Sequence, residues 1–157
     1  ESAKLVQRHR DVLIPVIERH GGKGKSTGGD GIVAAFGSAG QALSAAIDMQ
    51  QTLDAAVEID PRAREMLVRI GVAQGEVVLD KGGRPFLGAA LNLAARVMDL
   101  ADGGHIMTVG AVAAASDLGG PTLHPNGEFK LKNIAEPVPV VEVLWHDGME
   151  PQQIRAV

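Results

Sequence analysis

The sequence predicts a single α+β domain built on a mixed sheet. Its predicted strands and helices alternate without a strict strand–helix–strand rhythm, and two pairs of strands lie close enough in sequence to form hairpins. The chain has 157 residues, of which 45% are hydrophobic and 22% are charged, as is typical of one globular domain. We place this domain at residues 1–147 and a polar C-terminal tail at residues 148–157.

The start of the chain predicts a helix, a glycine-rich segment and a strand. Apolar residues recur at helical spacing over residues 3–19, and Pro15 should kink or shorten this helix. Residues 23–30 are rich in glycine and show little periodicity. The short apolar run Ile32–Phe36 is bounded by glycines and therefore indicates a buried strand.

The longest predicted helix follows this strand. Apolar residues recur every three or four positions from Ala39 to Val57, Ser38 is a suitable N-cap, and Asp60–Pro61 should end the helix. The remaining predicted elements are strands at 67–73 and 76–79 joined by a hairpin at Gln74–Gly75, a turn at 81–84, a helix at 88–101, a strand at 105–109, a short helix at 111–117, and paired strands at 128–134 and 138–145.

Composition excludes several classes of protein. The chain has no cysteine, which excludes disulfides, thiolate metal sites and a cysteine nucleophile. No apolar run approaches the ~18 residues of a membrane span, and the charged N-terminus does not resemble a signal peptide. We therefore expect no membrane segment and a cytoplasmic location. The net charge of −4 argues against a nucleic-acid partner, which requires a basic excess.

The first candidate site is the segment Lys25–Gly31, which leads directly into the strand at Ile32. Its Asp30–Gly31 pair is a hairpin-turn signal, so the turn alone can explain Asp30. Alternatively, the turn holds the carboxylate of Asp30 at a sheet edge, where its oxygens can bind a hard cation such as Mg²⁺.

The second candidate site is the pair Asn92 and Arg96, four residues apart on one face of a predicted helix. This face could simply be solvated, with Arg96 paired to Asp99 or Asp102. Alternatively, it binds a ligand, because an amide can orient a sugar and a guanidinium can meet phosphate oxygens through forked hydrogen bonds.

Other catalytic motifs are not found. Gly24–Ser26 is similar to the end of a P-loop, but Arg19 stands where the first glycine of that motif is required. No Ser/His/Asp arrangement is evident. None of the five histidines shows metal-ligand spacing: His9, His20, His105, His124 and His146.

Six short motifs occur in the order found in class III adenylate/guanylate cyclase catalytic domains, which the chain resembles over residues 5–145. The motifs are His20–Gly22, Gly29–Gly31, Arg69–Val77, Phe86–Arg96, Gly103–Gly104 and Leu131–Val138. The resemblance implies a ferredoxin-like mixed sheet of the nucleotide cyclase type with helices packed on it. It also implies that two such domains pair head to tail, with active sites in the cleft between them.

The resemblance further implies an activity. The ribose 3′-hydroxyl of a nucleoside triphosphate attacks its own α-phosphorus, which gives a cyclic nucleotide and pyrophosphate. Two Mg²⁺ ions, or Mn²⁺, assist by lowering the pKa of the hydroxyl and by shielding the triphosphate. We expect conversion of ATP to cyclic AMP, with ATP preferred over GTP, at a homodimer interface in intracellular signalling.

Three residues match functional positions of the family. Asp30 matches the second of its two metal-binding aspartates, Asn92 matches the asparagine that orients the ribose, and Arg96 matches the arginine that stabilises the transition state. In a homodimer, Asp30 of one subunit would face Asn92 and Arg96 of the other.

The start of the chain departs from the family pattern. The family's other metal aspartate lies on a strand well before the His-Gly-Gly motif, whereas only 19 residues precede His20 here and they predict a helix. Because that strand is central to the fold, its neighbours would keep unpaired backbone groups. We therefore expect a sheet that is incomplete at the N-terminus, in a fragment or in a domain that another chain completes.

The positions that select the purine also depart from the pattern. Ser26 stands at the position of the adenine-selecting lysine, with Lys25 adjacent as a substitute. Pro85 stands at the position of the partner aspartate and offers no acceptor to the adenine amino group. The alternative function is therefore a degenerate cyclase-like domain with little or no activity, which acts as a dimerisation or regulatory module.

Overall fold

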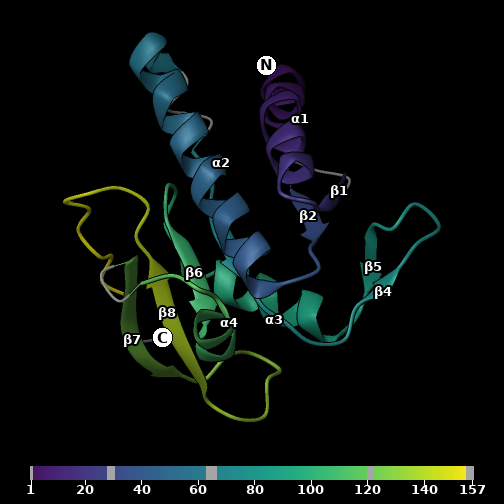
Figure 1. Ribbon diagram of the computed structural model, residues 1–157, viewed down its shortest axis with the longest axis vertical. Helices are drawn as coiled ribbons and strands as arrows, with labels where there is room; N and C mark the ends of the chain where they lie inside the picture. Colours follow the sequence, from purple (N-terminus) through teal and green to yellow (C-terminus); the bar gives the residue numbers. More distant parts are fainter. Residues whose placement is uncertain (1, 28–30, 63–66, 120–121, 155–157) are drawn as a thin grey trace.

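The computed structural model describes residues 2–27, 31–62, 67–119 and 122–154, and Figure 1 shows the arrangement of its elements. In chain order these are α1 (Ser2–Arg19), β1 (Lys23–Ser26), β2 (Ile32–Ala35), α2 (Ala39–Ile59), β3 (Ile70–Val72), β4 (Val78–Leu79), β5 (Pro85–Leu87), α3 (Ala89–Met98), β6 (Ile106–Val109), α4 (Gly110–Ala115), β7 (Leu123–Phe129) and β8 (Val138–Val143). None of the helices described is both long and apolar enough to cross a bilayer.

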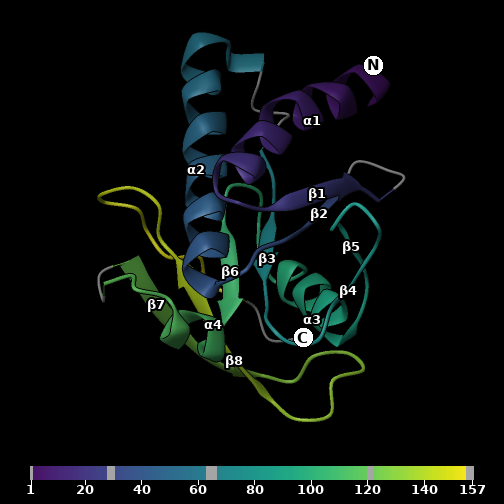
Figure 2. The same ribbon diagram turned by 45° about the vertical axis from the view of Figure 1, so that its right-hand side comes forward.

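The main sheet contains four strands in the order β3-β6-β8-β7. β3 runs parallel to β6, whereas β8 is antiparallel to both β6 and β7, which confirms the prediction of a mixed sheet. The other strands form two separate hairpins, β1–β2 and β4–β5. Among the described strands, none pairs with the outer edge of β3, so the sheet ends there (Figure 2).

The core lies between α2 and the main sheet. Leu43 and Ala46 of α2 are buried in the same cluster as Ile106 of β6 and Val140 of β8. α2 begins after Ser38, whose hydroxyl accepts a hydrogen bond from the backbone N–H of Gln41 at 3.1 Å; this confirms the predicted N-cap. A second cluster, formed around Leu13 and Leu53, packs α1 against α2.

The prediction of a hairpin at Gln74–Gly75 is wrong. β3 pairs with β6 across the α3 crossover, and β4 pairs instead with β5. Asp80 organises the turn between β4 and β5, because its Oδ1 atom accepts hydrogen bonds from the backbone N–H groups of Gly82 and Arg84, both at 2.9 Å. The predicted turn at 81–84 is thus confirmed, whereas β5, the strand that follows it, was not predicted.

The range predicted for the first helix, residues 3–19, is confirmed by α1. The helix continues past Pro15 to Arg19, because Val16 and Ile17 are buried almost completely and offset the cost of the proline. β2 is half-buried rather than buried, since among the described strands only β1 lies beside it.

Candidate active site

α3 has a fully packed inner face. Ala90 and Val97 are buried, and Leu93 packs against the main hydrophobic cluster. Beneath the helix, Gly71 of β3 has no side chain, and a Cβ atom there would come within 2.5 Å of the backbone nitrogen of Met98. The missing side chain therefore allows the backbones of β3 and α3 to approach each other closely.

The start of α3 is fixed by a second glycine. Gly88 has φ 143°, a conformation that side chains disfavour, and a Cβ atom there would overlap the carbonyl oxygen of Glu76. The same carbonyl accepts a hydrogen bond from the N–H of Ala90 at 3.3 Å. The first turn of α3 is thereby docked on the connection between β3 and β4.

The outer face of α3 carries Asn92 and Arg96, one turn apart, as the sequence predicted. Asn92 is exposed. Arg96 is 36% exposed, and its Nη1 atom lies 3.6 Å from Oδ2 of Asp99, which is 52% exposed. A pair this exposed contributes little to stability, so the guanidinium is accessible to a ligand.

The two small hairpins bring the predicted purine-selecting positions together. The Nζ atom of Lys25 lies 5.3 Å from the centre of the Phe86 ring, and Phe86 directly follows the buried Pro85. The guanidinium of Arg84 donates a hydrogen bond to the carbonyl of Gly24 at 3.1 Å and so ties β5 to β1. Ser26 is the last residue of β1 and is partly buried.

Asp80 belongs to this group, although sequence reasoning assigned it no role. Its Oδ2 atom lies 3.8 Å from Nζ of Lys25. The backbone N–H groups of Arg84 and Gly82, with the charge of Lys25, hold the pKa of Asp80 below its usual value. The carboxylate therefore stays ionised, and it lies beside an ammonium that also faces the ring of Phe86. Its position before Gly82–Gly83 was the available signal, since an aspartate is favoured at the start of such a turn.

Asp30 lies outside the described residues. The strands on either side of it pair as a hairpin, and the N–H of Thr27 donates to the carbonyl of Gly31 at 3.0 Å. Over the described ranges, no three His, Asp or Glu side chains converge on a metal site. Because Mg²⁺ is commonly held by one or two carboxylates together with substrate phosphates, the donor chemistry of Asp30 fits this ion.

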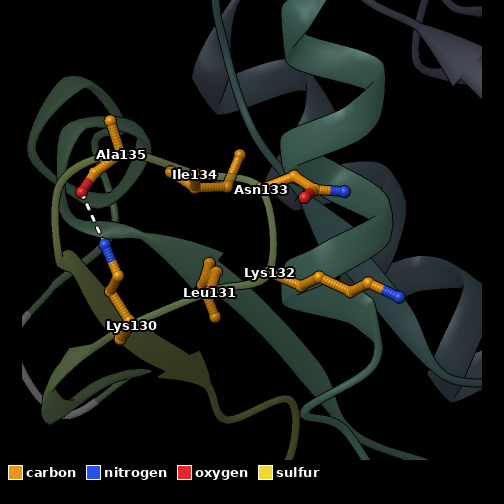
Figure 3. Close-up of a pocket in the computed structure, with 6 residues that line it drawn as sticks. All are labelled: Lys130, Leu131, Lys132, Asn133, Ile134 and Ala135. Carbon is orange, nitrogen blue, oxygen red and sulfur yellow. Dashed lines mark hydrogen bonds between the residues drawn. The ribbon is translucent and has the colours of Figure 1, made fainter.

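A curved loop between β7 and β8 encloses a shallow pocket, which is lined by the consecutive residues Lys130–Ala135. The Nζ atom of Lys130 closes the loop by donating to the carbonyl of Ala135 at 2.7 Å. In Figure 3, the side chains of Lys132 and Asn133 point to the side opposite this closure.

The loop is anchored near α3. Its apolar residues Leu131 and Ile134 belong to the same hydrophobic cluster as Leu93 and Val97 of α3. Figures 1 and 2 agree in placing the loop close to this helix. Lys132, on this loop, is an exposed cation to which the sequence-based predictions assigned no role.

Two comparisons with solved structures place this fold. An adenylate/guanylate cyclase/hydrolase from Silicibacter pomeroyi is similar with a TM-score of 0.73 and 33% identity, over 88% of this chain and 82% of that chain. The guanylyl cyclase Cya2 is similar with a TM-score of 0.72 and 26% identity, over 90% of this chain and 79% of that chain.

A sequence comparison agrees with these structures. The chain is 33% identical over 138 residues to "Putative adenylate cyclase 3" of Rhizobium meliloti (strain 1021). The matched region covers 85% of this chain but only 23% of that relative. No protein-family model matches the chain. On the identity to the Silicibacter pomeroyi enzyme and the shared fold, the chain belongs to the adenylate/guanylate cyclase family and is a nucleotide cyclase domain.

Proposed function

We propose that this domain converts ATP to cyclic AMP and pyrophosphate at sites shared between two copies of the chain. The observation that carries the proposal is the pair Asn92 and Arg96 on the outer face of α3. The packed inner face gives these side chains no structural task, and the weak contact with Asp99 does not account for an amide and a guanidinium at this spacing.

Each residue of this pair has a role in the reaction. The 3′-oxygen forms a bond to the α-phosphorus, the bond from that phosphorus to the bridging oxygen of pyrophosphate breaks, and the hydroxyl proton is lost. Asn92 orients the ribose so that its 3′-oxygen points at the phosphorus. Arg96 donates forked hydrogen bonds to the oxygens on which negative charge increases.

Asp30 is the residue of this chain that would hold Mg²⁺ or Mn²⁺. When bound, such an ion would make the 3′-hydroxyl more acidic and neutralise part of the triphosphate charge. The proposal places Asp30 of one copy opposite Arg96 of its partner. Lys132, on the loop beside α3, supplies a further positive charge for the phosphates.

Base recognition rests on Lys25 and its surroundings. Lys25 lies near both Asp80 and the ring of Phe86, whereas Pro85 has no side-chain acceptor for an adenine amino group. A site that lacks such a polar partner rejects the wrong base only weakly. We therefore propose ATP as the substrate with modest discrimination against GTP. Pro85 and Ser26, which depart from the family's purine-selecting residues, also favour the alternative function, a degenerate dimerisation or regulatory module.

The direct test is an assay of the full-length protein with ATP or GTP and either Mg²⁺ or Mn²⁺. Cyclic AMP is expected from ATP, and cyclic GMP from GTP at a lower rate, with a ratio far below the ~10⁴ that a complete set of polar partners would give. Chromatographic detection of the cyclic products measures both. A folded dimer that forms neither product at saturating nucleotide, although the family's first metal aspartate is supplied, would instead support the regulatory module.

The β4–β5 hairpin supports assembly as a homodimer. Its apolar side chains are unusually exposed: Val78 45%, Leu79 51%, Phe86 60% and Leu87 51%. Val78 and Leu87 are partners across the hairpin and share one of its faces, and exposed apolar neighbours of this kind mark interaction surfaces. Because α3 starts directly after this hairpin, a partner that covered it would also approach Asn92 and Arg96.

Replacement of Leu87 by serine is therefore expected to weaken the dimer about tenfold or more, since a buried interface leucine would be lost. Sedimentation velocity over a range of concentrations measures the change. The matched control is Ile59→Ser, because Ile59 is 88% exposed but lies at the end of α2, away from the hairpin. Equal dimer affinities for the two variants would show that the hairpin is not the interface.

A further inference from the structure

Strand β8 contains a buried carboxylate that the proposed reaction does not use. Glu142 has no exposed surface, although the rest of β8 is apolar. Its Oε2 atom accepts a hydrogen bond from Nδ1 of His105 at 2.6 Å, and its Oε1 atom accepts one from the backbone N–H of Gln152 at 2.7 Å. A buried carboxylate is tolerated only when it is bonded in this way.

The partners of Glu142 join two distant parts of the chain. His105 precedes β6, and the hydrogen bond to Glu142 raises its pKa above the usual value, against the opposing effect of burial. His124 of β7 faces Glu142 across the sheet. Gln152, in contrast, comes from the segment after β8, which the sequence predicted to be a polar tail.

The segment after β8 folds back onto the domain. The indole N–H of Trp145 donates to the carbonyl of Gly104 at 2.8 Å, and a turn closed by the N–H of Met149 and the carbonyl of His146 reverses the chain. Ile154 packs against the main hydrophobic cluster. We refer to residues 146–154 as the clasp.

The side chain of Gln152 bonds to the backbone immediately after α3. Its Oε1 atom accepts from the N–H of Asp102 at 2.8 Å, and its Nε2 atom donates to the carbonyl of Leu100 at 2.9 Å. One amide therefore satisfies a donor and an acceptor of the connection between α3 and β6, as a neighbouring strand would. Carbonyl groups past a helix end otherwise depend on water or on capping groups.

We propose that the clasp fixes the C-terminal end of α3 and that Gln152 is a positioning residue for Asn92 and Arg96. The inference rests on the proposed function, because it assigns these two residues to the reaction. Glu142 holds the clasp through the backbone of Gln152, and the side chain of Gln152 holds the helix end. Errors of about 1 Å in the placement of catalytic groups are costly, so a helix that carries two of them needs both ends held. Gly88 holds the first end.

Replacement of Gln152 by methionine tests the proposal, because methionine keeps the length of the side chain but removes both of its hydrogen bonds. Amide hydrogen exchange over residues 92–104 is expected to become about tenfold faster, while exchange in β8 stays unchanged. The kcat for cyclic nucleotide formation is expected to fall about tenfold with little change in KM, because Asn92 and Arg96 act in the transition state.

Two further variants sharpen the test. Gln153→Met alters the exposed neighbour and should match the wild type in exchange and kcat. Relative to Gln152→Met, the variant Gln152→Glu should recover part of the exchange protection and part of the kcat. Its carboxylate can still accept from the N–H of Asp102 but cannot donate to the carbonyl of Leu100. Identical exchange in Gln152→Met and Gln153→Met, or faster exchange with an unchanged kcat, would overturn the proposal. If the wild type forms no cyclic nucleotide, the proposed function fails, and the hydrogen exchange over residues 92–104 alone decides whether the clasp holds α3.

Discussion

Replacement of Arg96 by alanine is expected to lower the rate of cyclic nucleotide formation about 10³- to 10⁵-fold, the range measured for arginines that stabilise phosphoryl transfer. The expected loss is large because the guanidinium donates two hydrogen bonds to oxygens whose charge increases in the transition state. Arg96→Lys should recover little of it, since an ammonium keeps the charge but not the planar fork. Initial rates with saturating nucleotide and Mn²⁺ measure each variant.

The surface pair with Asp99 provides the matched control. If Arg96 served only to pair with Asp99, the two alanine variants would behave alike. In the proposed site, Asp99→Ala removes only a contact of 3.6 Å between exposed groups and should keep the rate within about threefold. Equal and small losses for Arg96→Ala and Asp99→Ala would remove Arg96 from the reaction.

A mixture of two inactive variants tests whether the site is shared between copies. Asp30→Ala and Arg96→Ala would each inactivate both sites of a homodimer. In a mixed dimer with two-fold symmetry of the backbone, one site loses both residues and the other keeps both. In an equal mixture about half of the dimers are mixed, and each of these has one intact site of two. The mixture should therefore regain about one quarter of the wild-type rate. A mixture that stays inactive, although the subunits exchange, would place both residues in one copy's site.

The features that sequence reasoning predicted correctly are encoded locally. The serine cap and the three- and four-residue spacing of α2 lie within a single segment, so Ser38 could be identified without knowledge of its neighbours. The same holds for Asn92 and Arg96, because four-residue spacing alone places them on one helix face. The exposure of this face was also predicted, because the residues between Asn92 and Arg96 are leucine and alanine and turn toward the other faces of the helix.

Strand pairing depends on distant residues and was predicted less well. Gln74–Gly75 is a local turn signal, but β3 pairs with β6, which follows α3 in the chain. β1 was missed because the sequence Lys23–Ser26 has no apolar alternation; it is a strand because it pairs with β2. The proximity of Lys25 to Phe86 likewise arises from the packing of two hairpins, which no spacing encodes.

The location of β7 illustrates how a turn signal can mislead. The predicted strand began at residue 128, whereas β7 covers Leu123–Phe129. Pro125 and Asn126–Gly127 indicate a turn by composition, but they lie at a bulge where the register with β8 shifts. β7 is the edge strand of the sheet, and an edge tolerates proline and a bulge. The predicted pairing of the last two strands is nevertheless confirmed.

The clasp was missed because its partner lies in another element. Residues 148–157 are polar, and composition alone indicates a solvated tail. The available signal was the single charged residue Glu142 within the apolar run Val138–Val143, since a carboxylate in a buried strand requires partners. That signal shows that something must bond to Glu142, but the sequence does not identify Gln152.

Replacement of Gly71 by alanine is expected to destabilise the domain by about 3 kcal/mol or more, at the upper end of the range for overpacked cores. The new Cβ atom would lie 2.5 Å from the backbone nitrogen and 2.7 Å from the Cβ atom of Met98, and it would overlap the carbonyl of Ala94. These are atoms of a helix held at both ends, so no side-chain rotation relieves the clash. Urea unfolding followed by circular dichroism measures the loss.

Gly40→Ala is the matched control, because it makes the same chemical change in an unobstructed position. A Cβ atom at Gly40 meets nothing within 4 Å, and the residue lies in the first turn of α2. This variant should gain about 0.5–1 kcal/mol, since alanine loses less conformational freedom in a helix. Opposite signs of the change in unfolding free energy for the two substitutions would show that contact with α3, and not the glycine itself, requires Gly71.

The displacement of α3 in Gly71→Ala should also lower the rate of cyclic nucleotide formation under conditions where the variant remains folded, whereas Gly40→Ala keeps the wild-type rate. A folded Gly71→Ala with full activity would mean that the site tolerates movement of the helix that carries Asn92 and Arg96.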